Sequence, residues 1–158
     1  MQILDLVMRT AHSVFASFWA GSVLFLTLAV LPTALDGTVN ADPMQTVVGK
    51  FRWVTRASAL VMFVTGGHLA GTLYTVGGGD GISLFGSPRG HLVLTMLGLW
   101  LVLTGLCEVA ASKLADGFDQ RKVRTPAREA KPFLYGASIV AVALLVVAVL
   151  IVRGGVLW

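Results

Sequence analysis

Four long segments without a single charged residue dominate this chain. An α-helix rises 1.5 Å per residue, so about 20 residues cross the roughly 30 Å hydrocarbon core of a bilayer. A transmembrane β-barrel would need short segments of alternating polarity, and the sequence contains none. The shortest charge-free segment has 18 residues, and the four are Thr10–Leu35, Ala57–Gly79, Gly90–Cys107 and Pro132–Val152. They predict an all-α, integral-membrane four-helix bundle in a single domain, residues 1–158, with helices at about 3–35, 53–76, 90–112 and 132–153.

The composition excludes most soluble classes of protein. Hydrophobic residues make up 56% of the chain and charged residues only 13%, with a mean hydropathy of +0.82. A soluble domain has roughly 25% charged residues. The single cysteine, Cys107, allows neither an internal disulfide nor a CxxCH haem-attachment motif. A soluble α/β enzyme, a disordered chain and a disulfide-stapled secreted domain are therefore excluded.

Basic residues predict the orientation in the membrane. The connection between the first two segments and the one between the last two share one side of the bilayer and carry nine Lys and Arg residues, against three on the other side. Because positive loops stay in the cytoplasm, we expect both termini on the outer side of a multi-pass cell-membrane protein. This also accounts for the pI of 9.7 without nucleic acid. The expected partners are the lipid bilayer, other membrane redox subunits or a second copy of the chain. The nine residues are Lys50, Arg52, Arg56, Lys113, Arg121, Lys122, Arg124, Arg128 and Lys131.

Three histidines are the main candidates for chemistry. His12, His68 and His91 fall on three predicted helices, all in the outer half of the bilayer, and ionisable residues at such positions usually mark a functional site. His12 and His68 match best in depth, and two facing imidazoles are common axial ligands of b-type haem. His91 is nearer the interface, beside Arg89. The alternative is that these histidines only form hydrogen bonds between helices.

The surroundings of these histidines permit a cofactor. Trp19 shares a helix face with His12, and glycines at positions 66, 67 and 71 reduce bulk beside His68, which would admit a flat macrocycle. Gly67 and Gly71 have an equally valid interpretation as a close helix-packing motif. We predict haem b with His12 and His68 as iron ligands, and with Trp19, Gly67, Gly71 and His91 at the site.

Copper is the competing ligand. Met8, Met62 and Met96 lie in the first three predicted helices, and thioether with imidazole suits Cu(I). Methionine is also a common filler of apolar segments. Glu108, at the inner end of the third helix, is expected to pair with Arg56 or Lys113, or to belong to a proton path.

Three short motifs resemble a known family. They are His12-SVFASF-Trp19-A-Gly21-SVLF, Phe51-RWVTRASALVMFVTG-Gly67 and Gly90-HLVLTMLGLWLVL. Together they resemble the copper-resistance D (CopD) superfamily, which includes the four-helix HemJ-type protoporphyrinogen oxidases, over about two-thirds of the chain. The resemblance implies that His12 is the functional histidine and that Trp19 and Gly21 shape its pocket. The family's third motif usually contains a lysine where this chain has Thr95 and Met96, so the resemblance leaves enzymatic activity open; such an enzyme would be an oxidoreductase.

These observations predict a small membrane haem b protein that transfers electrons or serves as a subunit of a membrane redox complex. The alternatives are a copper-handling permease of the CopD type and a structural membrane subunit without a cofactor.

Overall fold

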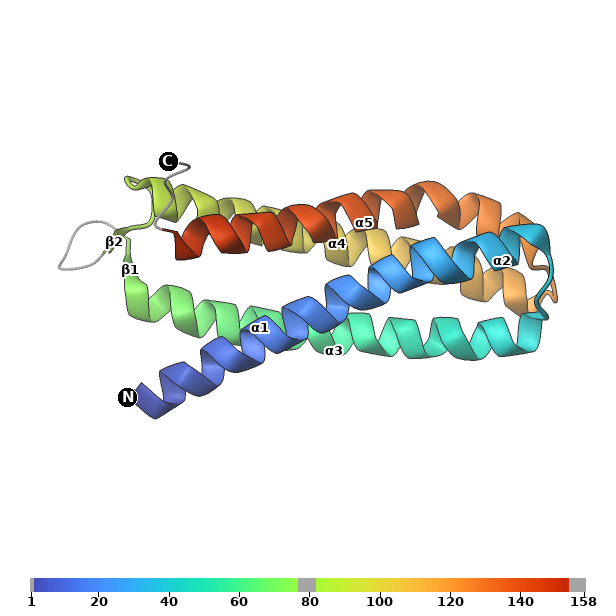
Figure 1. Cartoon of the computed structure of the whole chain (residues 1–158), viewed down its shortest axis with the longest axis horizontal. Coiled ribbons are helices and arrows are strands. Elements are labelled where there is room, and N and C mark those ends of the chain that lie inside the picture. The colour runs from blue at the N-terminus through green and yellow to red at the C-terminus, as the bar shows by residue number, and fades with distance from the viewer. Residues whose placement is uncertain (1, 77–81, 154–158) are drawn as a thin grey trace.

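Four long helical rods run antiparallel to one another in the computed structural model, which describes residues 2–76 and 82–153 (Figure 1). The first rod combines α1 (Gln2–Phe25), a π-helical turn η1 (Leu26–Val30) and α2 (Leu31–Asp36). The others are α3 (Ala41–Leu73), α4 (Pro88–Asp119) and α5 (Arg124–Val152). About 88% of the structure is helical, which confirms the all-α prediction.

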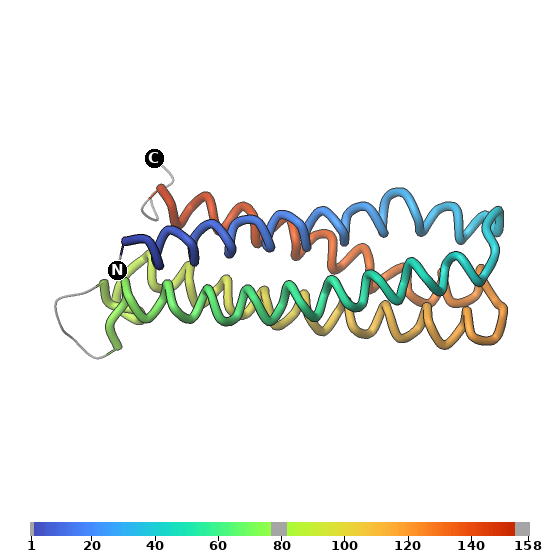
Figure 2. Tube along the Cα trace, turned by 90° about the horizontal axis from the view of Figure 1, so that it is seen from below, coloured from blue at the N-terminus to red at the C-terminus, as the bar shows by residue number. Residues whose placement is uncertain are grey.

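The rods form a square bundle in which each contacts the next in sequence and α5 closes against α1. In Figure 1, α4 and α5 lie above α3, and the first rod crosses obliquely from below α3 to the level of α4. In Figure 2, α1 and the C-terminal half of α5 share one side of the bundle. The start of α1 and the end of α5 lie at the same end of the bundle, and the α2–α3 and α4–α5 turns lie at the other (Figure 1). The basic residues near these two turns are therefore brought to one end, as the sequence predicted.

Three of the four predicted spans are confirmed as long and apolar enough to cross a membrane. Among the described residues, these are Gln2–Asp36, Pro88–Asp119 and Arg124–Val152. Helix α3 is similar in length, with 33 residues, but its apolar part begins only after Arg56 and contains the polar His68. This helix packs against α1 and α4.

The helices extend beyond the predicted boundaries on the basic side. Helix α3 begins at Ala41 rather than near residue 53, α4 continues to Asp119 rather than 112, and α5 begins at Arg124 rather than 132. The predictions followed the charge-free segments, which mark the hydrocarbon core. Charged residues such as Lys and Glu are good helix formers, so the rods continue as polar turns outside that core. Pro132 lies inside α5 instead of at its start.

A two-residue strand pair, which the sequence did not predict, follows α3. Strand β1 (Tyr74–Thr75) pairs in parallel with β2 (Ile82–Ser83), so that Tyr74 faces Ile82. The pair precedes α4 and lies at the end of the bundle where α1 begins (Figure 1).

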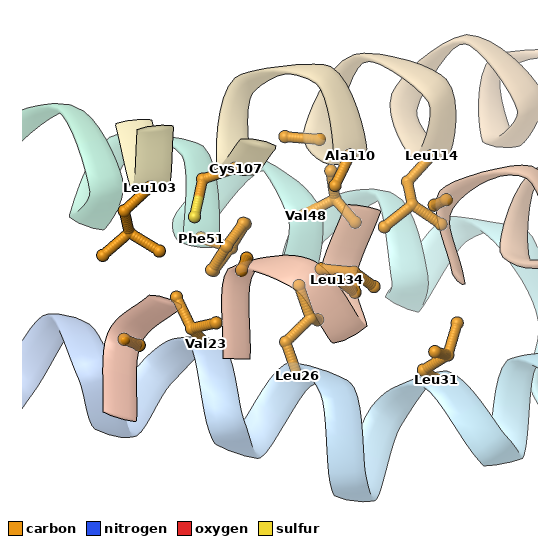
Figure 3. Packing of buried hydrophobic residues seen from close by; sticks show 14 of the residues in the cluster. Val23, Leu26, Leu31, Val48, Phe51, Leu103, Cys107, Ala110, Leu114 and Leu134 are labelled. Atoms are coloured by element: carbon orange, nitrogen blue, oxygen red, sulfur yellow. The ribbon is translucent and has the colours of Figure 1, made fainter. Parts of the chain in front are cut away.

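Small side chains fill the interface between α4 and α5, which is the most extensive in the bundle. Small residues let two helix backbones approach closely, and this is the usual device for packing helices in lipid. Figure 3 shows larger side chains around this interface, with Leu134 opposite Ala110 and Leu114, and Val23 and Leu26 contributed by the first rod. The almost fully buried alanines of α4 and α5 are Ala110, Ala111, Ala127, Ala130, Ala137 and Ala141.

The outer surface of the bundle is apolar. Phe18, Phe63, Ile139 and Val146 are each more than half exposed, and many other large hydrophobic side chains share this surface. Such continuous apolar surfaces are unstable in water and typical of contact with lipid. Small residues inside and large apolar residues outside are thus consistent with a bilayer.

The π-helical turn in the first rod accommodates Pro32. A proline cannot donate to the carbonyl four residues earlier and its ring pushes that carbonyl away. The N–H of Leu31 instead donates to the oxygen of Leu26, five residues back. The rod ends at Gly37, whose φ of +67° favours glycine.

Candidate functional site

His12 is held by a side chain of the neighbouring helix. Its Nδ1 lies 2.8 Å from Oγ1 of Thr65 on α3. The Thr65 hydroxyl has one hydrogen, and it donates this to the carbonyl of Val61 at 2.6 Å. With that hydrogen on the carbonyl of Val61, Thr65 accepts from Nδ1 of His12, and Nε2 keeps a free lone pair. A second partner that fixes the tautomer in this way is typical of histidines that bind metals.

Gly66 makes room for the imidazole of His12. A Cβ at position 66 would lie 3.1 Å from Cε1 of His12, closer than ordinary contact. From the sequence, Gly66 was expected to reduce bulk beside His68. In the structure it lies beside the imidazole of His12 instead. Gly67 and Gly71 are exposed, and a Cβ at either would have no atom within 4 Å among the described residues. They face away from the bundle.

His68 forms a separate contact with the first turns of α1. Its Nε2 lies 3.0 Å from Oδ1 of Asp5, and both side chains are partly exposed. His68 is not among the side chains that line the cavity beside His12. The contacts therefore place His12 and His68 in two distinct polar pairs of the same α1–α3 interface.

His91 lies near the start of α4, close to the strand pair. Its Nε2 is 2.7 Å from the carbonyl oxygen of Phe85, and because a carbonyl only accepts, Nε2 carries the proton. The residue is exposed, as expected for an interfacial histidine. Its contact stabilises the turn that enters α4.

A cavity of about 260 Å³ adjoins His12. Its lining is mostly apolar and comes from α1, α3, α4 and α5, with Trp19, Met62 and Met96 among the lining side chains. Exposed lining residues, including Ser17 and Val149, form its mouth between α1 and α5. Figure 1 shows these two helices diverging toward the end of the bundle where α1 begins and α5 ends. The cavity is slightly smaller than the roughly 300–1,000 Å³ typical of small-molecule sites.

The potential donor atoms of this cavity are one imidazole and two thioethers. From the sequence, Met62 and Met96 were candidate ligands only in the copper alternative, and Trp19 was expected at the haem site; the structure brings these three side chains to the His12 cavity. Met8 is not among the lining residues. Within residues 2–76 and 82–153, no group of three or more His, Cys, Asp or Glu side chains is placed to hold a metal ion. Any metal here would be bound by His12 with sulfur donors or within a cofactor.

A buried polar cluster lies deeper in the bundle and was missed by the sequence analysis. It comprises Trp19 of α1, Thr55 and Ser58 of α3, and Cys107 of α4, each at most 2% exposed. Among the described residues, Nε1 of Trp19 and the hydroxyls of Thr55 and Ser58 have no hydrogen-bond partner. A buried polar group without a partner costs about 1–3 kcal/mol. Polar residues at 55, 58 and 65 follow helical spacing, which is the signal that would have identified this face of α3.

An ion pair lies at the end of this face nearer the α2–α3 turn. Arg56 donates from Nε to Oε1 of Glu108 at 2.7 Å and from Nη2 to Oε2 of the same carboxylate at 3.0 Å. Nε of Arg52 is 4.0 Å from the same carboxylate. The expected pairing of Glu108 with Arg56 is confirmed, while Lys113 lies 3.7 Å from Glu129 instead.

Comparison with known proteins yields no match: no family model, no curated protein and no solved structure is similar to this chain. The resemblance to the CopD superfamily stays a prediction that rests on the three helix motifs.

Proposed function

We propose that the chain is a membrane haem b protein that transfers electrons, with His12 as an iron ligand. The supporting observation is the hydrogen bond from Nδ1 of His12 to Thr65, which leaves Nε2 available beside an apolar cavity. Neutral imidazole in an apolar helix-bundle pocket is the usual protein ligand of b-type haem. A bound haem would supply one-electron redox chemistry, and the chain would supply ligation, orientation and an apolar surrounding.

The donor set of the cavity fits an iron porphyrin. Iron accepts an imidazole nitrogen and either a second imidazole or a thioether as axial ligands. Met62 and Met96 line the cavity with His12, whereas His68, the second ligand predicted from the sequence, pairs with Asp5. The open mouth between α1 and α5 means that a ligand larger than 260 Å³ need not be fully enclosed.

The decisive experiment is an absorption spectrum of the protein purified in detergent after expression with ample haem. We expect a Soret band in the wild type and its loss in His12→Ala. The matched control is His91→Ala, because His91 bonds to the carbonyl of Phe85 and is not among the residues that line the cavity. A protein without a Soret band, or one that keeps it in His12→Ala, would refute the proposal.

The second ligand is identified by the same spectra with a redox titration. Met62→Leu and Met96→Leu nearly preserve apolar volume, so folding should survive. Because thioether ligation raises the midpoint potential, loss of a ligating methionine should lower it or convert the iron to high spin. If His68→Ala has that effect and neither methionine variant does, the two-histidine arrangement predicted from the sequence is correct.

Copper handling is the second candidate, because the cavity combines the imidazole of His12 with two thioethers. This donor set suits Cu(I). Under this alternative the purified protein is colourless, binds Cu(I) and loses it in the Met62→Leu, Met96→Leu double variant. Bound copper without a Soret band would favour this function over haem binding.

We also propose that the basic end of the bundle faces the cytoplasm and that both termini lie outside, in the cell membrane. The support is the excess of Lys and Arg near the α2–α3 and α4–α5 turns. This orientation places His12 in the outer half of the bilayer and Glu108 in the inner half.

A further inference from the structure

The buried polar cluster of Trp19, Thr55, Ser58 and Cys107 has the properties of a site for a small hydrogen-bonding ligand. Three of its polar atoms are buried and, among the residues that the structure describes, lack a partner. The neighbour that Thr55 and Trp19 share is the thiol of Cys107, which is fully buried and is only a weak donor and acceptor. Native proteins satisfy nearly all such groups, and a water molecule needs two to four polar partners. Two hydroxyls, an indole N–H and a thiol meet that requirement.

The cluster lies between the His12 cavity and the ion pair of Glu108. Along α3, Arg52, Thr55, Ser58 and Met62 recur every three or four residues and so lie on one face. The rise from residue 52 to residue 62 is about 15 Å. Met62 and Trp19 line the cavity at one end of this face, and Arg52 approaches Glu108 at the other.

We propose that the cluster binds water and, with it, forms a proton path between the His12 cavity and Glu108. The hydroxyls of Thr55 and Ser58 can each accept a proton and release their own to the next oxygen, so one proton passes and no other bond changes. The Trp19 indole only donates, so it orients water and does not relay. Glu108 is the group that exchanges protons with the aqueous phase, because it lies at the end of the path nearer the basic turns, where it bonds to Arg56.

The chain provides matched controls for this proposal. Thr27 and Ser138 are also buried, but their hydroxyls are satisfied: Ser138 donates to Thr27 at 2.9 Å, and Thr27 donates to the carbonyl of Val23 at 2.8 Å. Thr27 thus matches Thr55, and Ser138 matches Ser58, in residue type and in burial. Only the hydroxyls of Thr55 and Ser58 belong to the proposed path.

Proton flux is measured with the full-length protein in liposomes that contain a pH-sensitive dye, driven by a potassium diffusion potential. We expect wild-type flux above that of protein-free liposomes. Thr55→Val, Ser58→Ala and Glu108→Gln should each lower the excess at least about fivefold, while Thr27→Val and Ser138→Ala leave it unchanged. Flux equal to that of empty liposomes, or an equal loss in the control variants, overturns the proposal.

Thermal unfolding gives a readout that needs neither transport nor haem. If Thr55 binds water, Thr55→Val removes a satisfied hydrogen bond and lowers the melting temperature. If the hydroxyl is dry, the same change removes a buried unpaired group and raises the melting temperature, which contradicts the proposal. Both measurements use haem-free protein. They can therefore contradict the proton path without contradicting the haem proposal, and the absorption spectra can contradict the haem proposal without contradicting the proton path.

Discussion

The hydroxyl of Thr65 accepts a 2.8 Å hydrogen bond from Nδ1 of His12, which lies 53 positions earlier in the chain. This contact joins α1 to α3 and selects the tautomer of the imidazole. It also separates the roles of the histidines, since His68 and His91 contact Asp5 and Phe85 instead.

Removing the acceptor of His12 should weaken ligand binding without unfolding the bundle. In Thr65→Val the imidazole loses the partner that fixes its tautomer, and the loss of such a partner typically costs 10–100-fold in metal affinity. We expect a haem affinity lower by about that factor, measured by haem titration of the apoprotein. Thr72→Val is the control, because Thr72 is exposed and bonds only to the carbonyl of Leu69 on its own helix. Equal affinities in the two variants would contradict the role of Thr65.

Alanine substitution should change the absorption spectrum at Gly66 and leave it unchanged at the adjacent Gly67. Gly66→Ala places a methyl group 3.1 Å from Cε1 of His12, so the ring must shift and the absorption spectrum should change. Gly67→Ala places its methyl group in open space, so the spectrum should stay the same. A spectral change that occurs in Gly67→Ala and is absent in Gly66→Ala would mean that the cofactor lies on the outer face of α3.

The entry into α4 depends on the absence of a side chain at position 90. A Cβ on Gly90 would lie 2.0 Å from the backbone oxygen of Leu84, so Gly90→Ala must displace the turn. We expect a loss of about 1–3 kcal/mol in the free energy of unfolding. Gly98→Ala on the same helix meets no atom within 4 Å and should gain up to about 1 kcal/mol from helix propensity. Reversible unfolding in mixed micelles measures both changes.

The α4–α5 interface should not tolerate a larger side chain. Ala137 is fully buried, so Ala137→Leu forces the helices apart and should cost about 1–3 kcal/mol. Ile139, two positions along α5, is 71% exposed, and Ile139→Leu should change stability by less than about 0.5 kcal/mol. If the two variants unfold alike in the same micelles, these helices do not pack through their alanines.

The orientation can be tested by labelling single cysteines with an impermeant thiol reagent in intact cells. In a Cys107→Ala background, Phe85→Cys should label from outside, because Phe85 is exposed at the end of the bundle where α4 begins. Arg124→Cys, at the start of α5, should label only after the membrane is permeabilised. The opposite pattern would place His12 in the inner half of the bilayer.

Much of the fold could be predicted because its causes are local. Charge-free segments that match the thickness of a bilayer predict the spans, and three of them meet the length and hydropathy expected of a membrane helix. The pairing of Glu108 with Arg56 could also be predicted from the sequence, because opposite charges at the same depth in a membrane have few other partners. The helix ends were harder to predict. A charge-free segment ends where the hydrocarbon core ends, whereas α3 and α5 continue beyond it through turns that contain charged residues.

By itself, the sequence determined that this chain forms long apolar helices, that its basic residues gather at one end and that its histidines lie on the first three helices. Depth along a helix follows directly from residue number, at 1.5 Å per residue. Rotation of each helix about its axis does not, because it depends on which side chains pack against the neighbouring helices. Only the tertiary structure therefore decided that His12 faces Thr65 and lines a cavity with Met62 and Met96, that His68 turns toward Asp5, and that Thr55, Ser58 and Cys107 are buried in the core.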